Sequence, residues 1–340
     1  MIDLRSDTAT IPTEEMRAAM AAAEVGDEQL REDPTVNELQ RRTAELLGQE
    51  AALFLPTATM ANQIALKILT RPGCVLVAEE RTHILIFEAG GPAVHSGLVM
   101  MGLPGEAGRI TSAQLEEVTV RSEDVRDASV VVLENTHRSA GGRIWPLETF
   151  REVTASARSL GFAVHLDGAR LMNAAVAAGI PAAEWGSLAD TVTLCFSKGL
   201  GCPLGAVLAS SEERIERAWR EKFLFGGAIR QAGIVAAAAL YALDHHVGRL
   251  ADDHRRALRL AEGLAEAGLS VDLDAVETNF VGIEAPVGVE ADERLREAGV
   301  RLGWLRPGVF RAATYLGITD EDVDRAVDVI PQALGAVATT

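Results

Sequence analysis

Short apolar runs alternate with amphipathic segments through most of the chain. The runs are rich in Val, Leu and Ala and end in polar or glycine-containing turns. They predict buried strands at Leu53–Leu55, Cys74–Ala78, Val130–Leu133, Phe162–Leu166, Val192–Phe196 and Ala206–Ala209. Because strands that are apolar throughout and separated by helices are typical of parallel sheets covered on both faces, the pattern predicts an α/β fold with a mostly parallel central sheet flanked by helices.

The segments between the runs have helical periodicity. Thr35–Leu47 is one such segment, and Thr35 and Glu38 have the spacing of a capping box. Leu147–Leu160 is another, preceded by Pro146 and followed by Gly161. The Ala-rich stretch Ala228–His246 predicts a buried helix.

After residue 246 the pattern changes. The later segments predict a charged helix at Leu250–Ala267, two or three short strands near Val271, Phe280 and Phe310, and an acidic helix from Asp320. We therefore expect a large domain of residues 12–246, and a smaller α+β domain made of residues 1–11 and 247–340. This division suits 340 residues, which exceed the usual size of one domain.

Composition narrows the class of protein. The chain is 48% hydrophobic and 24% charged, which is typical of a globular protein, and its net charge of −17 disfavours nucleic acid and anionic membranes as partners. The first residues lack the pattern of a signal peptide, and no apolar stretch of about 18 residues occurs. The cysteines, Cys74, Cys195 and Cys202, form no CxxC pair, so neither disulfides nor structural zinc is expected. We expect a cytoplasmic protein.

The segment TVTLCFSKGLGCP places Lys198 directly after an apolar strand and before a glycine-rich turn. Open α/β sheets bind their ligands at the carboxyl ends of their strands. An amine in such a partly desolvated cleft can form a Schiff base with a carbonyl. An exposed loop lysine is the alternative.

The segment FAVHLDGAR ends a second strand in Asp167, with Arg170 three residues later. A carboxylate at this place can keep the pyridine nitrogen of pyridoxal 5′-phosphate (PLP) protonated, so that the ring acts as an electron sink. Arg170 would lie near the ring or a carboxylate, and His165 shares a strand face with Asp167. The alternative is that Asp167 only caps the helix that starts near Leu171.

The segment FLPTATMANQIAL is a strand, a turn and a helix. The hydroxyls of Thr57 and Thr59 and the free amides around Ala58 would suit a phosphate ester at the helix N-terminus. His83 follows a strand in ERTHILIFEAGG and could stack on a cofactor or move a proton. An ordinary capped turn and a loop histidine are the alternatives, but a phosphate turn, a strand-end acid and a strand-end lysine together favour a PLP site.

Several segments, in this order, resemble the L-threonine aldolases, which are PLP enzymes of fold type I. The resemblance extends over residues 3–245. It is carried by Asp3-Leu-Arg-Ser-Asp-Thr8, Glu32-Asp-Pro-Thr-Val-Asn37, Met60-Ala-Asn-Gln63, Glu134-Asn-Thr-His137, Gly141-Gly142, His165-Leu-Asp-Gly-Ala-Arg170, Ser197-Lys-Gly-Leu-Gly201 and Arg230-Gln231.

The resemblance implies a role for each matching residue. Lys198 would carry PLP as a Schiff base and His83 would stack over the ring. Asp167 would contact the pyridine nitrogen, with Arg170 near the ring. It further implies phosphate contacts from Ala58, Thr59 and a neighbouring subunit's Lys222, and contacts to the substrate α-carboxylate from Ser6 and Arg311. The implied reaction is retro-aldol cleavage of a 3-hydroxy-2-amino acid to glycine and an aldehyde, in a homodimer or homotetramer with shared active sites.

Some positions depart from the family pattern. Leu30 stands where tyrosine is common, Arg31 where glycine is, and Tyr315 where histidine is, while Arg126 is nearest to a missing histidine and is a further candidate for binding substrate. The identity of the base and the preferred aldehyde therefore stay open. So do β-elimination, a transaldol reaction and a PLP-binding protein without activity. We expect no catalytic metal.

Overall fold

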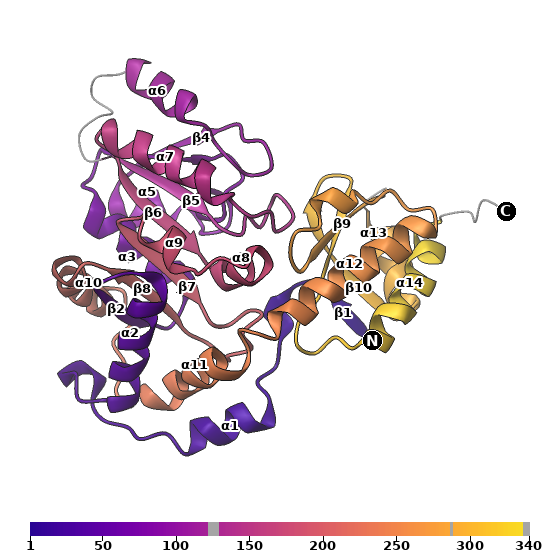
Figure 1. The fold of residues 1–340 in the computed structure, drawn as a ribbon, viewed down its shortest axis with the longest axis horizontal. Helices are drawn as coiled ribbons and strands as arrows, with labels where there is room; N and C mark the ends of the chain where they lie inside the picture. The colour runs from indigo at the N-terminus through magenta and orange to yellow at the C-terminus, as the bar shows by residue number, and fades with distance from the viewer. Residues whose placement is uncertain (122–128, 286–287, 336–340) are drawn as a thin grey trace.

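The computed structural model describes residues 1–121, 129–285 and 288–335. The chain forms a large α/β part and a smaller part that carries the N-terminal strand (Figure 1). Each part has its own sheet, of seven and four strands. The expected fold class is confirmed.

The large sheet has the order β2-β8-β7-β6-β5-β3-β4. Its strands are β2 (Ala51–Leu55), β3 (Val75–Glu79), β4 (Val99–Leu103), β5 (Val130–Glu134), β6 (Ala163–Gly168), β7 (Thr191–Cys195) and β8 (Ala206–Ser210). Only β8 runs against the others. The predicted strands are all present. The edge strand β4 was not predicted, because its residues are largely exposed and lack the buried apolar pattern.

Helices cover both faces of the large sheet (Figure 1). The helices of the large part are α1 (Glu14–Ala21), α2 (Pro34–Leu47), α3 (Ala58–Leu69), α4 (His83–Ile86), α5 (Gly91–Ser96), α6 (Ser112–Arg121), α7 (Leu147–Ser159), α8 (Leu171–Ala178), α9 (Ala183–Gly186), α10 (Glu212–Leu224) and α11 (Gly233–His245). Helix α1 lies away from the sheet and packs against α11, which packs against α2. The Ala-rich helix α11 thus starts at Gly233 and not at Ala228.

The small sheet has the order β1-β10-β11-β9, with α12, α13 and α14 packed beside it. These elements are β1 (Ile2–Leu4), α12 (Leu250–Glu266), β9 (Phe280–Glu284), α13 (Val289–Glu297), β10 (Val300–Arg306), β11 (Val309–Ala313) and α14 (Asp320–Leu334). The predicted strand near Val271 is wrong: only Ser270 makes an isolated bridge there, to Glu284.

The described residues form several apolar clusters, of which two are the largest. One lies around the large sheet, and the other joins Ile2 and Leu4 to the elements after Ala257. Leu250 belongs to the core around the large sheet, and the division into residues 12–246 and residues 1–11 plus 247–340 stays a prediction. In the described parts of the chain, no helix is long and apolar enough to span a membrane.

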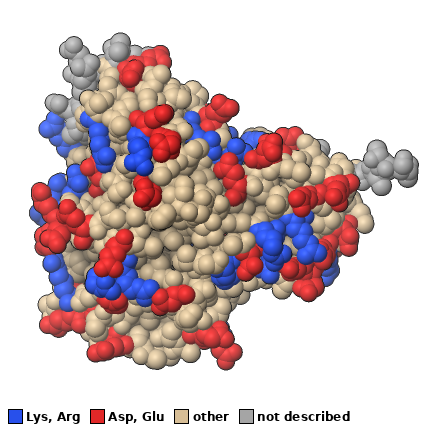
Figure 2. Space-filling model, in the orientation of Figure 1, with Lys and Arg blue, Asp and Glu red and all other residues tan. Residues whose placement is uncertain are grey.

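Charges on the surface are mixed. Figure 2 shows basic side chains over α12 with acidic side chains next to them. Arg256 and Arg259 of this helix pair with Asp320 and Asp324 of α14, at 2.7 and 2.5 Å. The basic groups here are thus matched by carboxylates.

The predicted capping box at Thr35 is wrong. Helix α2 begins with Pro34, and Asp33 is its N-cap, accepting a hydrogen bond from the amide of Val36 at 3.0 Å. The buried Asp33 carboxylate also accepts from the amides of Gly26 and Gly233, at 3.2 and 2.8 Å. The Thr35 hydroxyl instead donates to the carbonyl of Glu24.

We expect Asp33→Ala to lower the free energy of unfolding by about 2 kcal/mol or more, because the cap is lost and buried amides are left without acceptors. Thr35→Ala, in which only an exposed hydrogen bond is lost, is the matched control and should cost less than about 1 kcal/mol. Urea unfolding of both variants measures the difference. A larger loss of unfolding free energy in Thr35→Ala than in Asp33→Ala would mean that Thr35 caps the helix, as the sequence predicted.

Candidate active site

Side chains with the predicted roles gather at one edge of the large sheet. Because β2, β3, β5, β6 and β7 all run in the same direction, the residues that end or follow them meet at that edge. Those residues are Thr57, His83, Glu134, Asp167 and Lys198. Each comes from a different segment of the chain.

Asp167 lies in β6 and is 1% exposed. Its carboxylate accepts hydrogen bonds from the Asn62 side-chain amide at 2.9 Å and from the Ala169 backbone amide at 3.1 Å. Burial works against the charged form, but the nearby His83 and Lys198 outweigh it and hold the pKa of Asp167 below its usual range. A buried carboxylate that stays ionised suits the partner of a protonated ring nitrogen.

His165 supports Asp167 indirectly, through a hydrogen bond with Asn62. Its Nε2 lies 3.0 Å from Asn62 Oδ1 and its Nδ1 lies 2.8 Å from the Thr191 hydroxyl. Asn62 must turn its NH₂ group to the carboxylates, so its oxygen faces His165, which therefore carries its proton on Nε2. Burial lowers the pKa of His165 to about 4, and the ring is neutral.

This shift predicts a pH dependence of stability. An unfolded histidine titrates near 6.5, so between about pH 6.5 and 4 the unfolded chain binds the extra proton and the folded state is weakened, by a few kcal/mol at most. We expect the stability advantage of the wild type over His165→Gln to be full above pH 6.5 and to shrink towards pH 4. Thermal unfolding of the cofactor-free protein at both pH values measures it. An advantage that does not change with pH would contradict this account.

His83 begins the short helix α4 and is fixed at two points. Its backbone amide donates to Glu134 Oε2 at 2.6 Å, and its Nδ1 lies 3.2 Å from Glu88 Oε1. Burial lowers the pKa of His83, but Glu88, Asp167 and Glu134 together raise it above the usual value. Its side chain remains 26% exposed, so part of the ring faces open space.

Lys198 stands in the turn after β7, where its carbonyl accepts from the amide of Gly201 at 2.8 Å. Its positive charge helps to lower the pKa of both Asp7 and Asp167. The residue is partly buried. A lysine so placed suits covalent attachment of an aldehyde.

The predicted phosphate turn forms the start of α3. Thr57 is the N-cap, and its hydroxyl oxygen accepts from the amide of Met60 at 3.1 Å. The amides of Ala58 and Thr59, in the first turn, have no acceptor within the helix. The exposed side chains of Thr57 and Thr59 and these amides fit an anionic group.

Lys222 does not reach outward in this structure. Its side chain is fully buried in its own chain, paired with Glu28, and its ammonium donates to the carbonyl of Phe54 at 2.7 Å. Burial lowers the pKa of Lys222, and Glu28 acts against that change. A phosphate contact from a neighbouring subunit's Lys222 stays a prediction, and it would require Lys222 to leave Glu28.

Arg170 is held by Asp7. Its Nε and Nη2 donate to the two carboxylate oxygens at 2.7 and 2.6 Å, and both side chains are buried. Burial raises the pKa of Asp7, but Arg170 more than offsets this and brings it to about 2. Asn279 also donates to Asp7, at 3.4 Å. The N-terminal segment thus fixes the orientation of the arginine.

Arg311 lies beside this pair. Arg170 and Arg311 both contact the ring of Phe280, each with its guanidinium carbon 4.8 Å from the ring centre. Arg311 donates to the carbonyl of Arg5 at 2.6 Å, and its buried Nη1 has no hydrogen-bond partner among the described residues. Burial, with Arg138 and Arg170 nearby, lowers its pKa to about 9. An unpartnered buried cation group is suited to a carboxylate.

Ser6 lies directly before Asp7 and is the N-cap of the short 3₁₀ helix Asp7–Ala9. Its hydroxyl oxygen accepts from the Thr8 hydroxyl at 2.9 Å. Ser6 is thus next to Asp7 and, through it, close to Arg170. Arg126 lies outside the described residues.

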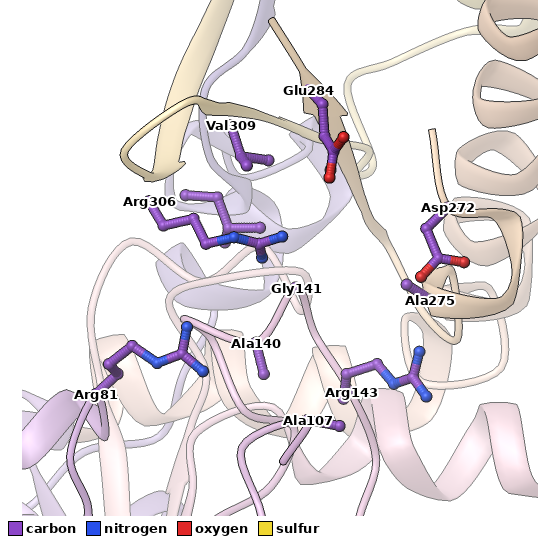
Figure 3. A pocket seen from close by; sticks show the side chains of 12 residues that line it. Arg81, Ala107, Ala140, Gly141, Arg143, Asp272, Ala275, Glu284, Arg306 and Val309 are labelled. Carbon is purple, nitrogen blue, oxygen red and sulfur yellow. The ribbon is translucent and has the colours of Figure 1, made fainter. Parts of the chain in front are cut away.

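A pocket of about 320 Å³ is lined by residues of both parts of the chain (Figure 3). Figure 3 shows Arg81, Arg143 and Arg306 turned towards it, with Asp272 and Glu284 on its other walls. Gly282, which also lines it, pairs with Arg311 across the small sheet. The pocket borders the Arg311 face of that sheet and carries charges of both signs.

The residues that depart from the family pattern differ in how far they are buried. Leu30 is 65% exposed and Arg31 has a left-handed backbone with φ of 61°, where glycine would be unstrained. Tyr315 is buried and its hydroxyl donates to the carbonyl of Asp3 at 2.8 Å. Tyr315 thus ties the first strand, β1, to the segment that follows β11.

Four residues of the site were not predicted as site residues. They are Asp7, Asn62, Glu88 and Glu134, and each is buried and hydrogen-bonded to a predicted site residue. All except Glu88 lie inside the segments that carry the resemblance. Their position in those segments was the signal by which the sequence could have identified these three as site residues.

One atom each of His83, Glu88 and Asp167 lie within 4.8 Å of one another. Amide groups of Asn62 and Gln63 already donate to these carboxylates, so the cluster is a hydrogen-bonded network. That no catalytic metal is needed stays a prediction.

The donor set fits PLP. A partly buried amine, an ionised buried carboxylate and a helix N-terminus with exposed hydroxyls lie at one sheet edge, and these are the groups needed for its aldehyde, ring nitrogen and phosphate. Lys198, Asp167 and the turn Thr57–Thr59 would hold the cofactor.

Comparisons with known proteins give the family. The model of the family described as beta-eliminating lyase matches residues 3–286. A probable low-specificity L-threonine aldolase 2 of Arabidopsis thaliana is 39% identical over 335 residues, covering 95% of this chain and 94% of that protein. The low specificity L-threonine aldolase of Escherichia coli K12 is 38% identical over 325 residues, covering 95% and 96%.

A solved structure shares the fold. The threonine aldolase of Leishmania major superposes with a TM-score of 0.85 at 18% identity, covering 98% of this chain and all of that one, 100%. By sequence and by fold, the chain belongs to the beta-eliminating lyase family and, within it, to the L-threonine aldolases.

Proposed function

We propose that this chain, with PLP held on Lys198, cleaves L-threonine, L-allo-threonine or related L-3-hydroxy-2-amino acids to glycine and an aldehyde. The observation that carries the proposal is the meeting of Lys198, the ionised Asp167 and the amides of α3 at one sheet edge. The relatives at 38% and 39% identity, named as threonine aldolases, support the same reaction.

When bound, PLP withdraws electrons from the amino acid's α-carbon, so that the bond to the β-carbon can break. Asp167, fixed by Asn62, supplies the negative charge for the ring nitrogen. Thr57, Ala58 and Thr59 supply hydroxyls and amides for the phosphate.

The cationic groups orient the substrate. The unpartnered Nη1 of Arg311 binds the α-carboxylate, with Ser6 and Arg170 next to it. His83 lies over the site and handles the proton of the β-hydroxyl, a contribution typically worth about 10²–10⁴-fold. Arg126 is retained as a candidate for contacts to the β-substituent.

The test is to incubate the PLP-loaded protein with L-threonine, L-allo-threonine and L-phenylserine separately, and to measure glycine and aldehyde. Equal amounts of both would establish the reaction and rank the substrates. PLP binding without glycine would overturn it.

The family description as beta-eliminating lyase favours one second candidate, β-elimination. That reaction would give ammonia and an α-keto acid from threonine, and no glycine. The same incubation therefore distinguishes the two reactions. A transaldol reaction would need an acceptor aldehyde, which can be added to the assay.

We also propose that the chain acts in the cytoplasm as a homodimer or homotetramer. Large apolar side chains are exposed in the single chain, among them Leu30 at 65%, Phe87 at 47% and Leu224 at 71%, and the Phe87 ring lies beside that of His83. Burying them against a second copy would stabilise an assembly. A monomeric mass by light scattering, with activity intact, would contradict it.

A further inference from the structure

Glu88 is a buried carboxylate that touches three site residues without belonging to a strand end. Its Oε1 accepts from Asn62 at 2.8 Å and lies 3.2 Å from His83 Nδ1, while its Oε2 accepts from Gln63 at 2.5 Å. It is 4% exposed. All its nearby partners are therefore protein donors.

The contact with Glu88 determines which nitrogen of the His83 ring carries a proton. An ionised carboxylate can only accept, so the imidazole Nδ1 facing Glu88 must carry a proton. In the neutral ring the lone pair is then on Nε2. The His83 ring is 26% exposed, whereas Glu88 is enclosed. Glu88 thus decides which nitrogen of His83 can take up a proton.

Asn62 connects this pair to the cofactor carboxylate. Its amide group donates to both Glu88 and Asp167, at 2.8 and 2.9 Å, and its oxygen accepts from the neutral His165. One amide therefore separates two negative charges that would repel each other. The network fixes the positions of His83 and Asp167 relative to one another.

We propose that Glu88 is a positioning residue: it holds the Nδ1–H tautomer of His83 and keeps Nε2 as the nitrogen that exchanges a proton in the site. The use of that proton rests on the proposed function, whereas the tautomer does not. The charged groups that act on His83 are Glu88, Asp167, Glu134 and Lys198. Among the three acids, Glu88 is the one hydrogen-bonded to the ring.

Glu88→Gln is a suitable test because it removes the negative charge and keeps the size and shape of the side chain. Gln63 Oε1 is buried without a partner among the described residues. If the Gln63 amide rotates, that oxygen can accept from a glutamine at position 88, but the Gln63 NH₂ group then stands where the unpartnered oxygen was, so Glu88→Gln is expected to lose some stability and its unfolding is measured alongside. Glu80→Gln, on the exposed Glu80 eight positions earlier, is the matched control for losing one negative charge.

The experiment is NMR of the holoenzyme with ¹⁵N-labelled histidine, with His83→Gln used to assign the signal. We expect the wild type to show His83 protonated on Nδ1. In Glu88→Gln its pKa should fall by at least about 1, because a hydrogen-bonded opposite charge is lost. Glu80→Gln should leave it unchanged, and Glu88→Asp should keep the pKa raised. The acid limb of kcat/KM should move to lower pH with it.

Two results would overturn the inference: a wild-type His83 protonated on Nε2 alone, or an unchanged His83 pKa in Glu88→Gln. The wild-type measurement needs no variant, so a Glu88→Gln chain that fails to fold does not remove the test. None of the NMR results depends on threonine cleavage. Failure of the proposed function and failure of this inference are therefore separate outcomes.

Discussion

Lys198→Ala is expected to reduce glycine formation by about 10³-fold or more, the scale of losing a covalent catalytic group. The chain has three lysines, Lys67, Lys198 and Lys222. Lys67 donates to the carbonyl of His95 from the side of α3, and Lys222 is buried against Glu28. Only Lys198, of these three, follows a strand at the site edge.

The measurement combines activity with the visible absorbance that PLP acquires when covalently bound to a lysine. Lys198→Ala should lose this band while still binding some PLP through the α3 turn and Asp167. Lys67→Ala is the matched control and should keep both band and activity. A band that survives in Lys198→Ala after denaturation and gel filtration would assign the cofactor to another lysine.

The sequence was sufficient to predict the large sheet and its strand-end residues, because both depend on local pattern. Buried parallel strands are nearly continuous apolar runs, and their polar ends are visible in the sequence. Lys198 and Asp167 were therefore predicted together. The edge strand β4 has exposed residues and lacks this signal.

Pairings between distant segments could not be predicted in the same way. Strand β1 pairs with β10 in parallel, Ile2 with Val300, so its place in the small sheet depends on residues about 300 positions later. Likewise Asp33 caps α2 in place of Thr35 partly because it also binds Gly233. Tertiary contacts decide these cases and outweigh local spacing.

The network behind the cofactor site was missed for the same reason. Asn62 looks like an ordinary helix residue in sequence, and only the fold brings it against Glu88, Asp167 and His165. Buried amides and carboxylates become informative when their partners are known. The ion pair of Asp7 with Arg170 was missed for the same reason, and breaking it is expected to lower the free energy of unfolding strongly.

Asp7→Asn is expected to lower the free energy of unfolding by about 3–5 kcal/mol, because it leaves the buried Arg170 guanidinium without its counter-charge. Both hydrogen bonds of the pair are short, at 2.6 and 2.7 Å, and Asp7 is fully enclosed. Asp3→Asn is the matched control four positions earlier. Its partner Arg5 is half exposed, so the loss should be under about 1 kcal/mol.

Chemical unfolding of the two single variants, and of Asp7→Asn combined with Arg170→Met, separates the causes. If the cost comes from the unpaired charge, the double variant should recover much of the stability lost by Asp7→Asn. A cost no larger than that of Asp3→Asn would mean that solvent reaches Arg170. Asp7 is hydrogen-bonded to Arg170, which follows β6 of the large sheet, and to Asn279, which precedes β9 of the small sheet. Because Arg170 lies beside Arg311, we also expect Asp7→Asn to raise KM for the amino acid, since the arginine next to the α-carboxylate would lose its fixed orientation.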